Sequence, residues 1–396
     1  IAMRRTIWNV ARLPAEQDFG RRGFGIYTTE PGSQALKDDR PLYTFMSFTV
    51  STYRSSDCPH TNGFVGEDNG LGALFRDYGE EYIKIYKPDI QQIKLIRSIR
   101  ICKTPYLGGK AYRCKGCDSV KYVYYSCGHS QCPKCQGMKR LKWQEKLRVR
   151  LLNVPYQHII YTMPHQLNSI ARRNPKQIYN ILFRSMWRSL RQTCERAENV
   201  GGKPGVIAVL HTFGSDLKYH VHLHCLVTFG GLDKKGKWHW PKRKKKLAGY
   251  RKLRKAFQQE FEEELGSVYE ELETKIGIEA LQSELGKKQW CVHCRPPTSD
   301  TKIIEEYLSR YINRIGVSKS KFKYDQVEQQ VLLTYNDYRN QKEGKAAPKD
   351  LLKLKPLLAL GQILQHVLPA YFQKCRYYGL HAPACAKKMA TELPQS

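Results

Sequence analysis

Acidic side chains are scarce in this sequence of 396 residues, which has 36 Asp and Glu against 67 Lys and Arg. The formal charge of +31 exceeds what solubility requires and indicates a polyanionic partner, most simply nucleic acid. No apolar run approaches the roughly 20 residues needed to cross a bilayer, and the N-terminus shows no secretory signal pattern. We therefore expect a cytoplasmic, nucleoid-associated protein with no membrane partner.

Cysteine is sparse except in one segment, where six of the 13 cysteines lie between residues 102 and 135. Two Cys-x-x-Cys pairs, Cys114/Cys117 and Cys132/Cys135, have the spacing of a closed tetrahedral zinc site with four thiolates. No thioredoxin-like pattern surrounds either pair, which argues against redox chemistry. The metal-type spacing argues for a reducing compartment. Basic residues occur throughout the segment, so we also expect it to contact DNA.

Two further cysteines leave the ligand set open. Cys127 is an alternative fourth ligand. Together with Cys102 and His129 it is also a candidate for part of a second zinc site. The spacing does not decide between these arrangements.

Three histidines at alternate positions mark the segment 218–228 as a β-strand. His220, His222 and His224 share one face, while the residues between them are apolar and predict a buried face. Neighbouring histidines, roughly 6.6 Å apart along the strand, can converge on one divalent cation. His220 and His224, about 13 Å apart by the same rise, are too distant to share it. The alternative is a solvent-facing polar strand.

The preceding segment, 205–213, is apolar and β-branched, and Gly214-Ser215-Asp216 supplies turn residues. The two strands are therefore predicted to form a hairpin that places His211 opposite residues 220–222. His211 becomes a candidate third metal ligand, provided that the register does not slip by one residue.

The loop 234–246 has eight Lys or Arg residues in thirteen positions. Its aromatic and basic residues are typical of surfaces that bind single-stranded nucleic acid, where cations follow phosphates and rings stack on bases. The alternative is that these charges only keep an exposed loop solvated and bind no nucleic acid. The candidate DNA-binding residues are Trp238, Trp240, Lys242 and Arg243.

The segment 303–314 predicts a helix in which Tyr307 and Tyr311 lie one turn apart on one face. Arg310 and Arg314 repeat that spacing. A tyrosine pair of this kind is usually part of a core. In a basic protein with a histidine strand, however, a phenolate can attack a phosphodiester and hold the DNA covalently, with the arginines neutralising charge on the phosphate.

Four segments are expected along the chain. Residues 1–70 show no sustained periodicity and are interpreted as an uncertain, poorly ordered extension. The expected units that follow are a zinc-binding, DNA-contacting domain at 71–145, a catalytic domain at 146–330, and C-terminal strands and helices at 331–396. Within the last unit, residues 351–378 are predicted to be largely helical.

Several motifs together resemble the IS91 family of transposases, which belong to the two-tyrosine class with a His-hydrophobic-His motif. The resemblance spans about residues 71 to 385. It is carried by Ser126–Gln136, the histidine run followed by Gly230-Gly231-Leu232, Tyr307–Tyr311, His366–Pro369 and Arg376–Leu380. Gly128-His129-Ser130 departs from the family's usual spacer after Cys127.

The resemblance implies an α+β fold with a central antiparallel sheet flanked by helices, plus a small Cys-rich zinc-binding domain. It implies a bacterial enzyme that nicks and rejoins single-stranded DNA at transposon ends and targets, through 5'-phosphotyrosine intermediates and without ATP. Zn²⁺ would be structural, and Mg²⁺ or Mn²⁺ catalytic. Of the two histidine frames we prefer His222/His224. Two alternative interpretations remain: a relaxase or replication-initiator-like nickase, and a non-catalytic zinc DNA-binding protein.

Overall fold

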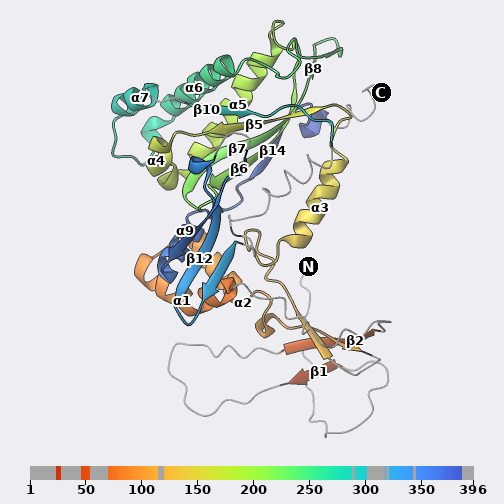
Figure 1. Ribbon diagram of the computed structural model, residues 1–396, viewed down its shortest axis with the longest axis vertical. Coiled ribbons are helices and arrows are strands. Elements are labelled where there is room, and N and C mark those ends of the chain that lie inside the picture. Colours follow the sequence, from red (N-terminus) through yellow and green to blue (C-terminus); the bar gives the residue numbers. More distant parts are fainter. Residues whose placement is uncertain are drawn as a thin grey trace, which may run out of the picture.

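The computed structural model describes residues 24–27, 46–53, 70–114, 120–287, 290–300, 317, 321–341 and 345–385. Two units dominate these residues, one built on a five-stranded sheet and one built on a helical pair with a three-stranded sheet (Figure 1). Nowhere in these ranges does a helix combine the length and the apolar composition needed to span a bilayer.

A five-stranded antiparallel sheet forms the larger unit, in the order β10-β5-β7-β6-β14. Its strands are β5 (Tyr156–Thr162), β6 (Gly205–Phe213), β7 (Tyr219–Thr228), β10 (Cys291–Cys294) and β14 (Cys375–Gly379). The predicted hairpin is present as β6 and β7, with β7 in the middle of the sheet. The expected central antiparallel sheet flanked by helices is thereby confirmed.

Helices cover one face of this sheet: α4 (Asn168–Arg173), α5 (Pro175–Glu195), α6 (Tyr250–Ser267) and α7 (Ile278–Gly286). Proline at the first turn starts α5, where its missing N–H costs nothing. In α6, Phe257 and Phe261 lie one turn apart and pack with Trp290 in the core. Burying each aromatic ring contributes about 1.5–3 kcal/mol. The short 3-10 helices η2 (His165–Leu167) and η3 (Tyr269–Glu271) connect these elements.

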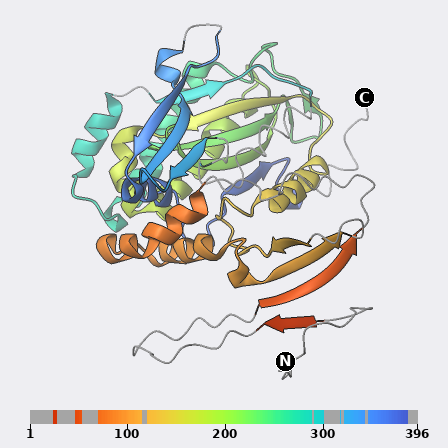
Figure 2. The same cartoon turned by 60° about the horizontal axis from the view of Figure 1, so that its bottom comes forward.

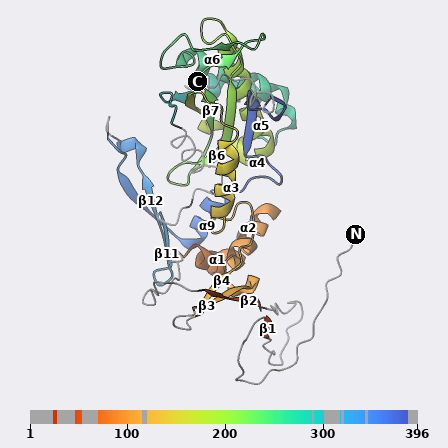
Figure 3. The same ribbon diagram turned by 90° about the vertical axis from the view of Figure 1, so that its right-hand side faces the viewer.

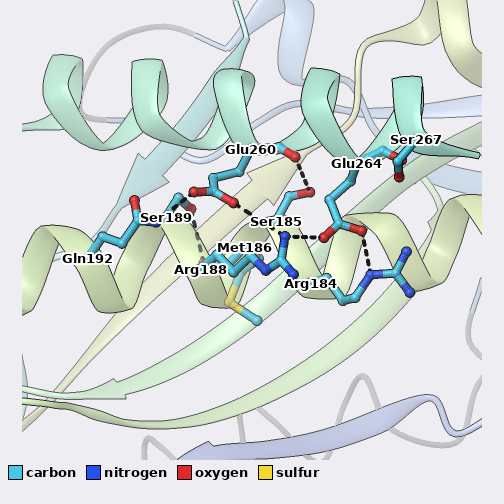
Figure 4. Close-up of polar contacts among 9 residues, drawn as sticks. All are labelled: Arg184, Ser185, Met186, Arg188, Ser189, Gln192, Glu260, Glu264 and Ser267. Atoms are coloured by element: carbon cyan, nitrogen blue, oxygen red, sulfur yellow. Dashed lines mark hydrogen bonds and ion pairs between the residues drawn. The ribbon is translucent and has the colours of Figure 1, made fainter.

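A polar bridge joins α5 to α6 where their apolar stripes end (Figure 4). The buried carboxylate of Glu264 accepts from Arg184 Nε at 2.6 Å and also pairs with Arg188. Ser185 Oγ donates to the backbone oxygen of Glu260 at 3.2 Å. The bridge fixes how the two helices sit against each other and hence against the sheet.

The opposite face of the sheet is partly covered by α3 (Gly137–Arg148). Leu147 and Trp143 of this helix pack with Tyr156, Ile207 and other residues of that face. This second face also carries the even-numbered side chains of β7, among them the histidines.

The smaller unit joins segments from both ends of the chain. Helices α1 (Leu71–Tyr86) and α2 (Ile90–Ile101) share a core with α9 (Pro356–Leu364) and the sheet β11 (Phe322–Asp325), β12 (Gln330–Asn336), β13 (Lys349–Leu354) (Figure 3). The 3-10 helix η4 (Tyr338–Asn340) follows β12. The segments expected as separate N-terminal and C-terminal units therefore bury their apolar faces against each other.

A further, four-stranded sheet of mixed parallel and antiparallel pairing, in the order β1-β2-β3-β4, lies on the outer side of α1 (Figure 2). Its strands are β1 (Phe24–Tyr27), β2 (Met46–Tyr53), β3 (Gly109–Cys114) and β4 (Val120–Tyr124), and η1 (Pro105–Leu107) precedes β3. Because β2 pairs with β1 and in parallel with β3, residues 24–27 and 46–53 belong to this sheet, which the expectation of a loose extension did not include.

The largely helical interpretation of residues 351–378 is wrong. The segment contains the strand β13, the nine-residue helix α9 and the strand β14. A short apolar run does not distinguish strand from helix by its periodicity. Here the choice is made by strand pairing, of β13 with β12 and of β14 with β6.

Candidate metal centres

Three histidines converge on the second face of the five-stranded sheet. His211 on β6 is the register partner of His222 on β7, within the range that the hairpin predicted. One ring nitrogen from each of His211, His222 and His224 lies within 4.8 Å of the other two. The His222/His224 frame is therefore the one whose nitrogens meet, and His220, which is exposed, is not in the group.

The sequence dictates this arrangement through the other face of β7. Tyr219, Val221, Leu223 and Cys225 are all buried in the core beneath α5 and α6. Because side chains alternate along a strand, burying them turns His222 and His224 to the second face. That face is not open to solvent: His211, His222 and His224 are only 2%, 8% and 5% exposed.

Two of the three buried imidazoles, His222 and His224, are electrically neutral near pH 7. Burial lowers the pKa of His222 to about 3 and holds that of His224 well below its usual range. His222 Nδ1 lies 2.8 Å from the backbone oxygen of His220. Since a carbonyl only accepts, Nδ1 carries the proton and Nε2 carries a lone pair.

The geometry fits a divalent cation. His222 Nε2 and His224 Nε2 lie 3.0 Å apart, and nitrogens bound to one ion at about 2.1 Å are separated by roughly 3–3.5 Å. Imidazole donors suit transition ions better than Mg²⁺, which prefers oxygen. Of the two expected ions, Mn²⁺ suits this donor set better.

A fourth histidine, His158 on β5, adjoins the group and was not identified from the sequence. Its Nε2 lies 3.1 Å from His224 Nδ1, and burial lowers its pKa to about 3. A single histidine in a largely apolar segment gives no signal in the sequence. Only the pairing of β5 with β7 brings it beside His224.

Four cysteines form the second candidate centre. Their sulfur atoms all lie within 4.8 Å of one another: Cys102, Cys127, Cys132 and Cys135. Cys127 Sγ is 3.7 Å from Cys135 Sγ. Four thiolates around Zn²⁺ at about 2.3 Å are separated by about 3.8 Å, so the set fits a structural zinc ion.

This set differs from the one that the paired spacing favoured. Cys102 and Cys127 complete it in place of Cys114 and Cys117; Cys117, and the side chain of Cys114, lie outside the described residues. Cys102 is the C-cap of α2 and buried in the same core as Cys132. The sequence indicated Cys102 only as a candidate for a second site, because it lies at a helix end 25 residues before the nearest of the other three cysteines. His129 Nδ1 instead accepts from the Gln131 N–H at 3.2 Å.

The basic loop carries a small hairpin, β8 (Gly231–Leu232) and β9 (Trp238–His239). Trp240 is 56% exposed, and its ring lies 5.7 Å from that of the partly buried Trp238. Lys242 and Arg243 are exposed. Trp238 packs on Gly230, where φ is +152° and a Cβ would overlap the indole.

One buried amide ties this loop to the five-stranded sheet. Gln157, next to His158 on β5, donates to the backbone oxygens of Lys245 and Arg295 and accepts from the Leu247 N–H. The basic loop is thereby held at the end of β5. The four remaining candidates (Tyr307, Arg310, Tyr311 and Arg314) lie outside the described residues.

Two family profiles match the chain. The transposase zinc-binding domain of IS91 elements matches residues 74–163, and a family described as putative transposase matches residues 205–389. The putative transposase y4qJ of Sinorhizobium fredii is 30% identical over 321 residues, covering 78% of this chain and 79% of the relative. The chain belongs to the IS91 transposase family.

A second relative of this transposase is the transposase for insertion sequence element IS801 of Pseudomonas savastanoi pv. phaseolicola. It is 27% identical over 304 residues, covering 74% of this chain and 70% of the relative. The cysteine cluster falls within the matched zinc-binding domain, and the histidine hairpin falls within the second matched region.

Solved structures resemble the transposase only weakly. The metal-bound conjugative relaxase TrwC in complex with oriT DNA is 20% identical, with a TM-score of 0.24, over 28% of this chain and 43% of the relaxase. The metal-free form of that complex is 12% identical, with the same TM-score, over 41% of this chain and 74% of the relaxase.

Proposed function

We propose that this transposase cuts and rejoins single-stranded DNA at the ends of its element and at the target, through covalent phosphotyrosine intermediates. The observation that carries the proposal is the convergence of three buried imidazoles, of which His222 and His224 are held neutral by burial, in a strongly basic protein. Membership of a transposase family adds the substrate class, DNA, and the reaction class, strand transfer.

A divalent ion held by His211, His222 and His224 would polarise the scissile phosphate. Tyr307 and Tyr311 are the proposed nucleophiles. The phenolic oxygen of one tyrosine forms a bond to phosphorus, the bond to the 3' oxygen breaks, and that oxygen leaves as a hydroxyl. The product is a 5'-phosphotyrosine, from which a 3' hydroxyl can later displace the tyrosine.

The basic loop is the proposed single-strand path. Trp240 offers an exposed ring for base stacking, and Lys242 and Arg243 offer charge for phosphates. Gln157 anchors the loop at the end of β5, the strand that also carries His158. Arg310 and Arg314 are proposed to contact phosphate near the tyrosines.

The zinc ion is proposed to be structural. Cys102 and Cys132 are buried in the core that joins α1 and α2 to α9, so four thiolates there leave no open position for a substrate. In addition, Gln131 within the cluster's loop exchanges hydrogen bonds with the backbone of Leu368, which ties the cluster to the segment after α9.

The proposal is tested with labelled single-stranded DNA from the element's ends. The wild-type transposase is expected to cleave it with Mn²⁺ and to stop when EDTA is added. His222→Ala should abolish cleavage while zinc content, measured by plasma emission, stays at the wild-type value. Loss of zinc in His222→Ala, or cleavage that persists in it, would contradict the assignment of the two centres.

A further inference from the structure

His158 on β5 lies next to His224, on the side of that ring facing away from His211 and His222. Its Nε2 is 3.1 Å from His224 Nδ1, and the two rings lie nearly parallel with centroids 5.3 Å apart. His158 is itself 8% exposed. It faces Nδ1 of His224, whereas Nε2 of His224 faces His222, so His158 is not placed to be a ligand.

The protons of the pair His222/His224 are constrained by their partners. Nε2 of His222 bears a lone pair because its Nδ1 donates to the His220 carbonyl. The 3.0 Å distance between His224 Nε2 and His222 Nε2 is favourable in two cases. Either His224 Nε2 donates to His222, or both nitrogens present lone pairs to one cation.

We propose that His158 is a positioning residue that sets the tautomer of His224. For Nε2 of His224 to bind a cation, the ring proton must stand on Nδ1, and His158 Nε2 is the acceptor placed to hold it there. A hydrogen bond of this kind orients a ligand imidazole and increases its basicity. His222 has the same support from the His220 carbonyl, so each ligand of the pair is fixed through its other nitrogen.

The same contact also serves the alternative tautomer. When His224 carries its proton on Nε2, its Nδ1 accepts from His158 Nε2–H, and the bond direction is reversed. Passing between the two states moves one proton on His224 from Nε2 to Nδ1 and one on His158 from Nε2 to Nδ1. Both rings remain neutral and no net proton is gained or lost, which a buried site requires because charging either ring is costly.

This inference rests on the proposed cation site, and its test separates the two. Mn²⁺ affinity is measured by isothermal titration calorimetry on the full-length, zinc-loaded protein for wild type, His222→Ala, His158→Phe and His158→Gln. Phenylalanine keeps a ring but offers no acceptor, whereas the glutamine oxygen can accept near the position of Nε2. His165→Gln, on the exposed histidine of η2, is the matched control.

His158→Phe is expected to raise the Mn²⁺ dissociation constant about 10–100-fold, with His158→Gln within about threefold of wild type and His165→Gln unchanged. Equal affinity in His158→Phe and wild type overturns the inference alone. Equal weakening by Phe and Gln also overturns it, because the ring rather than the acceptor would then matter. A wild type that binds Mn²⁺ no better than His222→Ala overturns the cation site itself.

Discussion

His211 and His222 face each other across the β6–β7 pair, with ring centroids 5.2 Å apart and interplanar angle 74°. Near-perpendicular rings allow their nitrogens to point to a common position instead of stacking. The relationship depends on register: a slip of one residue would exchange the buried and histidine faces of a strand. The turn alone does not set this register: Phe213 pairs with Tyr219 next to the turn, and an irregularity between Phe213 and His211 shifts the pairing by one residue, which brings His211 opposite His222.

Cys102 distinguishes the zinc set found in the structure from the set favoured by spacing. Cys102→Ser should remove one zinc ion per chain and destabilise the unit built on α1 and α2, because a structural zinc site contributes directly to folding. Zinc content is measured on purified protein by inductively coupled plasma emission spectrometry. Cys291→Ser, at an exposed cysteine, should keep wild-type zinc. Full zinc in Cys102→Ser, with loss in Cys114→Ser, would favour the two Cys-x-x-Cys pairs instead.

Trp240 is expected to contribute base stacking to DNA binding. Trp240→Ala should weaken single-stranded DNA binding by about 1–3 kcal/mol, the usual contribution of one stacked base. Fluorescence anisotropy with a labelled oligonucleotide provides the measurement. Tyr371→Ala, which removes another exposed aromatic side chain in the segment after α9, is the control and should bind like wild type. An unchanged affinity in Trp240→Ala would remove the loop from the proposed strand path.

Glu264 holds α5 against α6, and its side chain is 8% exposed while those of Arg184 and Arg188 are nearly half exposed. Glu264→Gln should lower the free energy of unfolding by about 1–2 kcal/mol, because two charged hydrogen bonds weaken but the arginines can still reach water. Urea unfolding followed by circular dichroism measures this. The exposed pair Glu198–Lys252 supplies the comparison, since Glu198→Gln should cost less than about 0.5 kcal/mol. Equal effects would mean that the bridge contributes no more than a surface pair.

Buried histidines predict a loss of stability in mild acid. Burial lowers the pKa of His158 and His222 to about 3 and that of His366 and His381 to about 4. Below about pH 6.5 the unfolded chain binds protons that the folded chain does not. Stability is therefore complete above that pH and falls as the pH drops toward 4, by about 1.4 kcal/mol per pH unit for each such histidine.

Urea midpoints between pH 7 and pH 5 test this dependence. His381→Gln should reduce the slope by about one proton, whereas His165→Gln, at an exposed histidine, should leave it unchanged. A wild-type midpoint that stays constant over this range would contradict the neutral, buried state of these rings.

The sequence predicted the local elements well where periodicity was strong. The histidine hairpin follows from the alternation of apolar and polar residues and from the turn residues at Gly214-Ser215-Asp216. Burial of the odd-numbered side chains of β7 places the three histidines on one face, and the choice of His222/His224 rested on the family resemblance. By contrast, His158 and Cys102 reach their clusters only through β5–β7 pairing and the packing of α2, which local patterns do not encode.

Long-range pairing also explains the errors in the C-terminal part. Pro356–Leu364 alone is helical between residues 351 and 378, because β13 finds a partner in β12 and β14 finds one in β6. The burial of α9 against α1 and α2 likewise joins two segments about 270 residues apart, which no local pattern predicts.

The covalent intermediate is the central claim, and its most direct measurement is a denaturing gel of the transposase mixed with end-labelled single-stranded DNA and Mn²⁺. We predict a shifted band that disappears with protease, with EDTA and in the double variant Tyr307→Phe/Tyr311→Phe. Each single Tyr→Phe variant should impair strand transfer. DNA binding without any shifted band, on several end sequences, would contradict the phosphotyrosine mechanism and leave a zinc-dependent DNA-binding protein.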